Sequence, residues 1–352
     1  MVAECYTMTY QRLQITAIHE ETPVCKTFEL QPLDKWEPQY TAGQFLTLVF
    51  SKNGTERRRS YSFSSAPLLG EPMRITIKRV VNGEYSRQLL DHSKTGDILT
   101  TAGISGLFQL PEGTALQQTQ QLFFLAAGSG IVPVFALLKT ALHTTQLPVI
   151  LVFSNRSAAD AIFYNELQLL QQTFAGRLHI EFLFSDIAHV RKSRLSNWLL
   201  LQLLQELVTV PITKCLFYMC GPFEYMQTIG ITLLAEGVPA LHIRKENFSS
   251  IPPAKKPAPP DTGAHKATIH LHHHTHEVMV QYPHSILAAA KAKGIELPYS
   301  CEAGRCGSCI ATCTSGKIWM AYNEILVNEE IAQGRILTCQ SFPVDGDVEI
   351  KF

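Results

Sequence analysis

The sequence contains few cysteines and has no excess of either charge. Nine cysteines in 352 residues are far too few for a small secreted fold held together by disulfides. The 30 Lys and Arg residues balance 30 Asp and Glu residues, so the formal net charge is +0. Without an excess of positive charge, the chain has no field that attracts nucleic acid or an anionic membrane. We therefore expect no disulfide scaffold and no nucleic-acid partner.

Long hydrophobic runs are also missing. No segment reaches the roughly 18 consecutive apolar residues that a membrane-spanning helix needs. Residues 1–14 lack the basic start and apolar core of a signal peptide. The most apolar segment, LSNWLLLQLLQELV (195–208), is interrupted by polar residues and fits an amphipathic helix. The sequence thus predicts a cytoplasmic protein without membrane insertion.

Proline is concentrated in one place. Five prolines lie between Pro252 and Pro260, where missing backbone donors favour an extended spacer over a packed core. A chain of this length is expected to form two or three domains. We therefore predict a linker over residues 249–267 and a separate C-terminal domain over residues 268–352.

The secondary-structure pattern of the residues before the linker changes once, near residue 115. Up to residue 115, short β-type runs alternate with turns, which predicts an antiparallel β-barrel over residues 8–115. Beyond it, apolar strands alternate with helical segments, which predicts an α/β domain with a doubly wound parallel sheet over residues 116–248.

Two glycine-containing turns stand at strand ends of the predicted parallel sheet. In LAAGSGIVPVFALL (125–138), Gly128 and Gly130 let the backbone approach a phosphate at a helix N-terminus, and Pro133 suits the first helical turn. YMCGP (218–222) ends a later strand. Ligands of open α/β sheets lie at the carboxyl ends of strands, so Cys220, Gly221 and Pro222 should face the same crevice. Taken alone, a tight turn and a buried cysteine explain these motifs equally well.

A third motif, RSYS, occupies residues 59–62 at the end of a predicted barrel strand. Facing outward, Arg59, Tyr61 and Ser62 offer a phosphate partner, a stacking ring and a hydroxyl. An ordinary strand edge is the alternative interpretation.

In this order and spacing, the three motifs resemble the ferredoxin–NADP reductase superfamily, in which a flavin-binding barrel precedes a pyridine-nucleotide domain. The resemblance covers residues 8–248. It implies that Arg59 binds the flavin pyrophosphate, that Tyr61 lies against the isoalloxazine and that Ser62 lies near the flavin N5. NGEYSRQL (82–89) is similar to the family's G-x-x-S element, which implies two further phosphate contacts, Gly83 and Ser86.

The same resemblance implies residues on the nicotinamide side. Cys220 would lie beside the nicotinamide, and Glu246 and Phe248, in RKENF, would supply an acid and an aromatic ring near the flavin. Ser62, Cys220 and Glu246 are thus the candidate catalytic residues. After the second parallel strand Arg156 precedes Asp160, which favours NADPH over NADH, although solvated surface residues would look the same.

The cysteines themselves gather near the C-terminus. Cys301, Cys306 and Cys309 have the C-x₄-C-x₂-C spacing of plant-type 2Fe-2S ferredoxins, and Cys339 follows as a fourth ligand. A zinc site is the rival, but it would pair its cysteines as two short halves. Residues 268–352 resemble the ferredoxin family, which implies a β-grasp fold of the α+β class.

Two further features of the C-terminal domain are predicted to have no role in binding the cluster. Cys313, four residues after Cys309, is predicted to be a buried strand residue and not a ligand. HLHHHTH (270–276) is predicted to be an exposed hairpin turn with incidental metal affinity.

Together the three domains predict an electron path from NAD(P)H through a flavin to a 2Fe-2S cluster. The domain order resembles the reductase components of multicomponent oxygenases, including those of phenylacetyl-CoA epoxidases. FAD is expected rather than FMN, although the phthalate-dioxygenase type of reductase uses FMN. The resemblance implies an oxygenase, epoxidase or desaturase as electron acceptor, a ring-hydroxylating dioxygenase being another. A zinc-binding or redox-sensing module is the non-enzymatic alternative.

Overall fold

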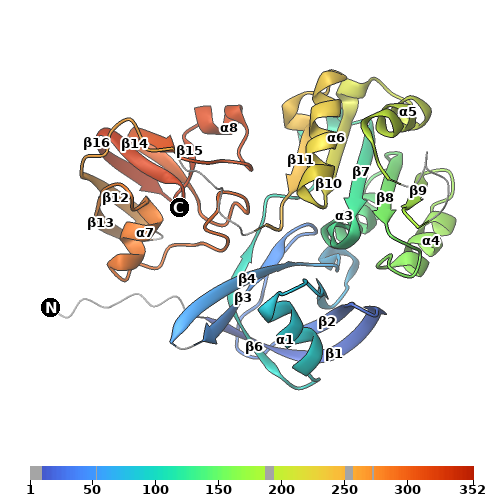
Figure 1. Cartoon of the computed structure of the whole chain (residues 1–352), viewed down its shortest axis with the longest axis horizontal. Helices are drawn as coiled ribbons and strands as arrows, with labels where there is room; N and C mark the ends of the chain where they lie inside the picture. The colour runs from blue at the N-terminus through green and yellow to red at the C-terminus, as the bar shows by residue number, and fades with distance from the viewer. Residues whose placement is uncertain (1–9, 53, 187–193, 250–256, 272) are drawn as a thin grey trace. The chain divides into compact units, whose positions relative to one another are not determined.

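The computed structural model describes residues 10–52, 54–186, 194–249, 257–271 and 273–352 (Figure 1). The chain forms two compact units. One contains nearly all of residues 11–247, and the other contains residues 248–352. Each unit is built around its own sheets and cores, and each is described separately below.

The first sheet of the larger unit is antiparallel and has the strand order β4-β3-β6-β1-β2-β5. Phe63, directly after β4, forms a bridge with Ile75 of β5. This bridge brings the two edges of the sheet together, as the predicted barrel requires. The interior is filled by buried apolar residues of β1, β2, β3 and β5, and partly buried residues of β4 and β6 pack against them. The strands are β1 (Gln11–Thr22), β2 (Cys25–Pro32), β3 (Phe45–Lys52), β4 (Thr55–Ser62), β5 (Met73–Lys78) and β6 (Ile98–Ser105).

The second sheet of this unit is parallel, with the order β11-β10-β7-β8-β9. Helices α3 and α4 pack on one face and α5 and α6 on the other, so the predicted doubly wound arrangement is confirmed. The strands are β7 (Gln121–Ala127), β8 (Val149–Asn155), β9 (Leu178–Phe184), β10 (Cys215–Cys220) and β11 (Ile243–Glu246). The helices are α3 (Ile131–Thr144), α4 (Tyr164–Thr173), α5 (Asn197–Leu207) and α6 (Phe223–Ala235).

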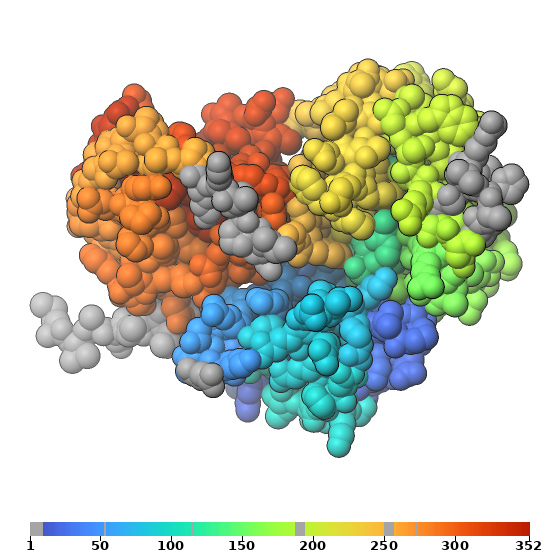
Figure 2. Space-filling view, viewed as in Figure 1, coloured from blue at the N-terminus to red at the C-terminus, as the bar shows by residue number. Residues whose placement is uncertain are grey.

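Two short helices lie between strands of the larger unit. Helix α1 (Glu84–His92) lies between β5 and β6, and α2 (Thr114–Gln118) lies between β6 and β7. In the space-filling view, the antiparallel part (blue to cyan) packs directly against the parallel part (green to yellow) (Figure 2). The segment 195–208 is the amphipathic helix α5, whose four buried leucines face the sheet. No helix among the described residues is long and apolar enough to cross a membrane.

The smaller unit contains a mixed sheet with the order β13-β12-β16-β14-β15, in which only the β12–β16 pair is parallel. Helix α7 packs against this sheet and shares its core. Its N-cap is Ser285, whose hydroxyl accepts a hydrogen bond from the Ala288 N–H. The elements are β12 (His265–Leu271), β13 (His274–Val280), α7 (Ile286–Ala292), β14 (Ile310–Met320), α8 (Asn328–Ala332), β15 (Arg335–Leu337) and β16 (Ser341–Lys351).

Candidate functional site

The RSYS motif ends β4, but its three side chains do not all face outward as predicted. Arg59 and Tyr61 are half-buried, whereas the Ser62 side chain is buried. Successive residues of a strand point to opposite faces, so Ser62 lies on the face opposite to Arg59 and Tyr61. Tyr61 packs against the barrel core, so Ser62 faces away from that core, and the expectation that all three side chains share one outward face was wrong.

Ser62 is buried because it meets a partner from the parallel sheet. Its hydroxyl donates a hydrogen bond of 3.2 Å to the Glu246 carboxylate. Glu246 is the last residue of β11 and only 7% exposed. Burial raises its pKa to about 8, against a smaller opposing effect of the Ser62 hydroxyl. At neutral pH the site therefore contains a carboxylic acid, which can hold a proton beside Ser62.

Cys220 lies next to this pair. It ends β10, and the parallel register places it opposite Glu246. Its side chain is fully buried, and burial, followed by the neighbouring Glu246, raises the pKa of its thiol well above the usual value. The structure thus brings all three predicted catalytic residues together and keeps Cys220 as a neutral thiol. Phe248, two residues after Glu246, is 49% exposed.

The glycine turn after β7 is shaped by its neighbours. A Cβ on Gly130 would lie 2.0 Å from the Cys220 carbonyl oxygen, and one on Gly221 would lie 3.0 Å from the Ala127 Cβ. The two predicted glycine motifs therefore pack backbone to backbone at the carboxyl ends of β7 and β10. Gly128 has a left-handed φ of 55°, which only glycine adopts without strain. Pro133 is the third residue of α3, as predicted, and is buried.

Lys78 is a candidate that the sequence analysis missed. It is the last residue of β5, and its Nζ lies 3.5 Å from the position that a Cβ on Gly128 would take. A cation from the antiparallel part thus lies over the turn expected to hold phosphate. Nothing in the sequence places residues 78 and 128 together, because their proximity depends on how the two sheets pack.

The end of β8 carries the residues expected near the adenosine. Asn155 Nδ2 is a buried polar atom for which the described residues supply no hydrogen-bond partner, so this strand end fits a polar ligand. Arg156 is exposed. The Ser157 hydroxyl donates a hydrogen bond of 2.6 Å to the Asp160 carboxylate.

The predicted phosphate contacts Gly83 and Ser86 lie at the N-terminus of α1, with Gly83 as its N-cap. The Ser86 hydroxyl accepts a hydrogen bond of 3.2 Å from the Val80 N–H. A Cβ on Gly83 would meet the Val80 Cβ at 2.7 Å, so glycine is required in this tight turn.

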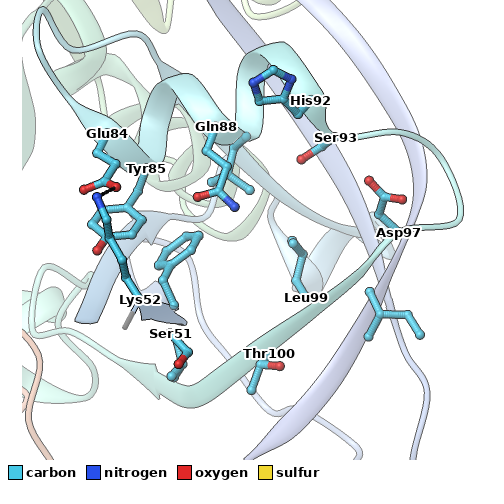
Figure 3. Close-up of a pocket in the computed structure, with 14 residues that line it drawn as sticks. Ser51, Lys52, Glu84, Tyr85, Gln88, His92, Ser93, Asp97, Leu99 and Thr100 are labelled. Atoms are coloured by element: carbon cyan, nitrogen blue, oxygen red, sulfur yellow. Dashed lines mark hydrogen bonds and ion pairs between the residues drawn. The ribbon is translucent and has the colours of Figure 1, made fainter. Parts of the chain in front are cut away.

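Helix α1 also borders a cavity of about 590 Å³, whose other walls come from β3 and β6 (Figure 3). Glu84, Gln88 and His92, one helical turn apart, face it, and Glu84 pairs with Lys52 across its mouth. None of the predicted flavin-binding residues is among its lining residues. The cavity therefore follows one side of α1, whereas the predicted site lies at its N-terminus.

The predicted cluster cysteines form two pairs of sulfur atoms. Cys309 and Cys339 are buried, with their Sγ atoms 3.3 Å apart. The Cys306 thiol hydrogen-bonds to the Cys301 sulfur and lowers its pKa to about 6, helped by backbone N–H groups and opposed by burial. Similarly, the Cys309 thiol lowers the pKa of Cys339. Each pair thus contains one sulfur that favours the thiolate form, which binds iron.

The paired arrangement fits a cluster of two irons, each taking two cysteines. Within the described parts of the chain, no three His, Cys, Asp or Glu side chains are grouped around a position for one metal ion. Gly304 has a φ of 74°, and a Cβ there would lie 2.9 Å from the Tyr322 carbonyl oxygen. The tight loop turns backbone N–H groups towards the sulfurs, and the Ala303 N–H lies 3.4 Å from the Cys301 Sγ.

Gln340 is a second residue that the sequence analysis missed. Its side chain is completely buried, and its Nε2 donates to the Glu302 carbonyl at 2.9 Å and lies 3.7 Å from the Cys339 sulfur. The signal in the sequence was an amide next to a ligand cysteine, in TCQS. Such donors tune cluster potentials.

Cys313 and the histidine segment 270–276 lie on the strand and at the hairpin turn predicted for them. Cys313 is part of β14, half-buried and not fully buried as expected, with its thiol 3.3 Å from the Ser315 carbonyl oxygen. The remaining histidines of 270–276 lie around the β12–β13 turn, and His272 is outside the described residues. Of the other cysteines, Cys25 and Cys215 are buried, and Cys5 lies outside the described residues.

Three protein-family models match this chain in the order of its sheets. A model described as "Oxidoreductase FAD-binding domain" matches residues 13–110, one described as "Oxidoreductase NAD-binding domain" matches residues 124–230, and "2Fe-2S iron-sulfur cluster binding domain" matches residues 269–344. The chain belongs to the ferredoxin–NADP reductase family of flavoreductases, in the group that carries a C-terminal 2Fe-2S ferredoxin domain.

Curated relatives match over nearly the whole chain. The 3-ketosteroid-9-alpha-monooxygenase ferredoxin reductase component of Rhodococcus rhodochrous is 30% identical, over 97% of this chain and 96% of the relative. One of the proteins that make up the 1,2-phenylacetyl-CoA epoxidase of Escherichia coli K12 is 31% identical, over 98% of both chains. Among solved structures, a phthalate dioxygenase reductase has a TM-score of 0.60 at 21% identity and covers 98% of both chains, which shows that the fold is shared.

These matches confirm that the flavoreductase is an NAD(P)H-dependent oxidoreductase with FAD and a 2Fe-2S cluster. FMN and the non-enzymatic alternative are set aside. The residues fit the groups: glycine-walled turns for phosphates, the Asn155 amide at the end of β8, which has no partner among the described residues, and paired thiols for iron. When bound, FAD supplies the chemistry that accepts two electrons and releases them singly.

Proposed function

We propose that this flavoreductase transfers electrons from NAD(P)H through FAD and the 2Fe-2S cluster to a separate oxygenase of the phenylacetyl-CoA epoxidase type. One observation carries the proposal: a single chain contains a hydride-accepting flavin domain and a one-electron cluster domain. A hydride carries two electrons, whereas the cluster takes one at a time, so the flavin must lie between them.

We assign the binding roles by motif. Ser62, Cys220 and Glu246 are the residues at the reacting atoms, supported by the Ser62–Glu246 hydrogen bond and the Cys220–Glu246 register. The remaining residues orient the cofactors: Arg59, Tyr61, Gly83, Ser86 and Phe248 for FAD, Gly128, Gly130, Pro133, Arg156, Gly221 and Pro222 for the nucleotide, and Cys301, Cys306, Cys309 and Cys339 for the cluster.

NADPH is the proposed nucleotide. Arg156 is exposed at the end of β8, and the next acid along the chain, Asp160, already accepts a hydrogen bond from Ser157. An arginine here favours a 2′-phosphate, and a free acid would favour a ribose hydroxyl. Replacing Arg156 with Ala should lower kcat/KM for NADPH about 10-fold and leave that for NADH nearly unchanged. An equal effect on both would contradict the assignment.

The acceptor is tested by reconstitution. The relatives at about 30% identity include a component of a phenylacetyl-CoA epoxidase and the ferredoxin reductase of a 3-ketosteroid 9α-monooxygenase, so the steroid oxygenase is the second candidate. The purified chain is combined with each oxygenase and its substrate, and NADPH oxidation is compared with product formed. We expect coupled turnover with the epoxidase. Coupling only with the steroid oxygenase would overturn the epoxidase assignment, and coupling with neither would overturn both.

We also propose the domain boundaries 8–115, 116–248 and 268–352, with the proline-rich linker at 249–267. The separation of compact units near residue 248 supports this division. Limited proteolysis should cut first within 249–267 and release a yellow flavin fragment and a smaller fragment that retains iron. First cleavage inside either fragment would contradict the boundaries.

A further inference from the structure

Lys139 of α3 forms an ion pair with Glu71, which lies in the turn before β5. The ammonium group contacts both carboxylate oxygens, with Nζ 2.7 Å from Oε1. Lys139 is only 8% exposed and the Glu71 side chain is 23% exposed, so the pair is partly shielded from water. The two residues fall in different matched regions, Glu71 in the FAD-binding region and Lys139 in the NAD-binding region.

Each partner is anchored in its own part of the larger unit. Glu71 Oε2 also accepts a hydrogen bond of 2.7 Å from the backbone N–H of Ala66, four residues after Ser62. The Lys139 ammonium lies 4.4 Å from the centre of the Phe135 ring, which stacks on Phe163. The pair therefore connects the chain that leaves the flavin strand β4 to the helix that begins at the glycine turn.

Apolar packing is incomplete around this connection. A cavity of about 490 Å³ lies beside the pair, and its walls come from the β1–β2 hairpin, β5, α3 and α4. Both Glu71 and Lys139 line it. Where side chains do not fill the space between two elements, packing alone cannot fix their spacing. Ala42 and Phe108 of the antiparallel part share an apolar core with Leu137 of α3, and beside the cavity a short contact between charged groups adds to this packing.

We propose that Lys139 and Glu71 are positioning residues that set the distance between the bound nicotinamide and the flavin. Helix α3 begins directly after Gly130, so a shift of α3 moves the turn expected to hold the nucleotide. Hydride transfer requires reacting atoms about 3–3.5 Å apart, and a misplacement of about 1 Å can cost a factor of about 100. The inference rests on the hydride transfer in the proposed function.

The test compares Lys139→Met, Glu71→Gln and their combination with the wild-type chain. Reduction of bound FAD by saturating NADPH is followed by stopped-flow absorbance, with NADH in parallel. We expect each single variant to be about 10- to 100-fold slower, and the double variant to be no slower than the slower single variant, because the two residues act as one unit. The FAD content and flavin midpoint potential should stay unchanged.

Two further variants keep the test decisive. Arg12→Met removes a more exposed ion pair, Arg12–Asp34 at 2.7 Å, that lies wholly within the antiparallel part of the unit, and its rate should remain within a factor of two of wild type. The reversed pair, Lys139→Glu with Glu71→Lys, should recover at least part of the rate lost in either single variant. If the single variants do not fold, the FAD reduction rate of the reversed pair tests the proposal in their place.

Wild-type limiting rates in the single variants, or a loss confined to NADPH affinity, would overturn the positioning role. So would a lower melting temperature with an unchanged rate, because that indicates only a structural contact. If wild-type FAD is not reduced by NADPH or NADH at all, the proposed function fails instead, whatever the variants do.

Discussion

The hydroxyl of Ser62 donates a 3.2 Å hydrogen bond to the carboxyl group of Glu246, across 184 residues of sequence. Ser62 ends the flavin strand β4, and Glu246 ends the edge strand β11 of the parallel sheet. The bond therefore marks where the two cofactor regions meet. Because burial raises the pKa of Glu246 to about 8, this junction holds a protonated acid at neutral pH.

The raised pKa of Glu246 predicts a pH-dependent stability. Between its ordinary pKa near 4.5 and its folded value near 8, the unfolded chain releases the proton while the folded chain retains it. The free energy of unfolding should therefore fall as the pH rises through this window, by at most about 1.4 kcal/mol per pH unit. Glu246→Gln should remove this loss, as measured by denaturant unfolding of the holoprotein from pH 5 to 9.

Glu224→Gln, at an exposed position of α6, is the matched control and should follow the wild-type pH dependence. If wild type and Glu246→Gln differ by the same free energy at every pH, the carboxyl does not titrate in this window and the account of Ser62 and Glu246 is wrong.

The cysteine pairs predict which residues hold the cluster. Cys306→Ser should lose most of the iron and abolish electron delivery to a protein acceptor, yet still oxidise NADPH with an artificial acceptor that takes electrons from the flavin. Cys313→Ser should keep two irons per chain and full activity, because its thiol points to the Ser315 carbonyl. Iron analysis and both assays decide this, and loss of both activities in Cys306→Ser would refute separate flavin and cluster modules.

The packing of the two glycine motifs predicts that alanine substitution has opposite effects on stability at two glycines of the nucleotide region. Gly130→Ala places a Cβ 2.0 Å from the Cys220 carbonyl, so it should cost about 1–3 kcal/mol of stability and slow FAD reduction at least 10-fold. Gly230→Ala, inside α6 with its nearest neighbour at 3.5 Å, should stabilise by about 0.5–1 kcal/mol. Thermal unfolding measures the stability of both variants, and stopped-flow absorbance measures their rates of FAD reduction. Equal stabilities and rates in the two variants would contradict the close contact at Gly130.

Lys78 predicts an electrostatic contribution to nucleotide binding. Lys78→Met should raise the Kd for NADPH about 10-fold and weaken its dependence on salt, because a cation over the phosphate turn is lost. Lys78→Arg should retain most of the affinity. Equilibrium titration at two ionic strengths measures both effects, and an unchanged Kd in Lys78→Met would exclude this role.

The sequence predicted those features that depend on local order along the chain. Strand and helix periodicity predicted the first two sheets, the resemblance to ferredoxins implied the third, and the C-x₄-C-x₂-C spacing predicted three cluster ligands that share one loop. The missed features depend on tertiary packing. Lys78 reaches Gly128, and Lys139 reaches Glu71, only because two separately folded sheets pack together. The burial of Ser62 has the same origin, since its partner Glu246 lies 184 residues away.

The central claim is that this chain converts hydride from NADPH into single electrons on its C-terminal cluster. The most direct measurement is anaerobic addition of NADPH to the full-length protein, with absorption and electron paramagnetic resonance spectra taken during reduction. The account predicts bleaching of the flavin followed by the paramagnetic signal of a reduced 2Fe-2S cluster. A protein that contains two irons per chain and bleaches its flavin, yet develops no cluster signal, would contradict it.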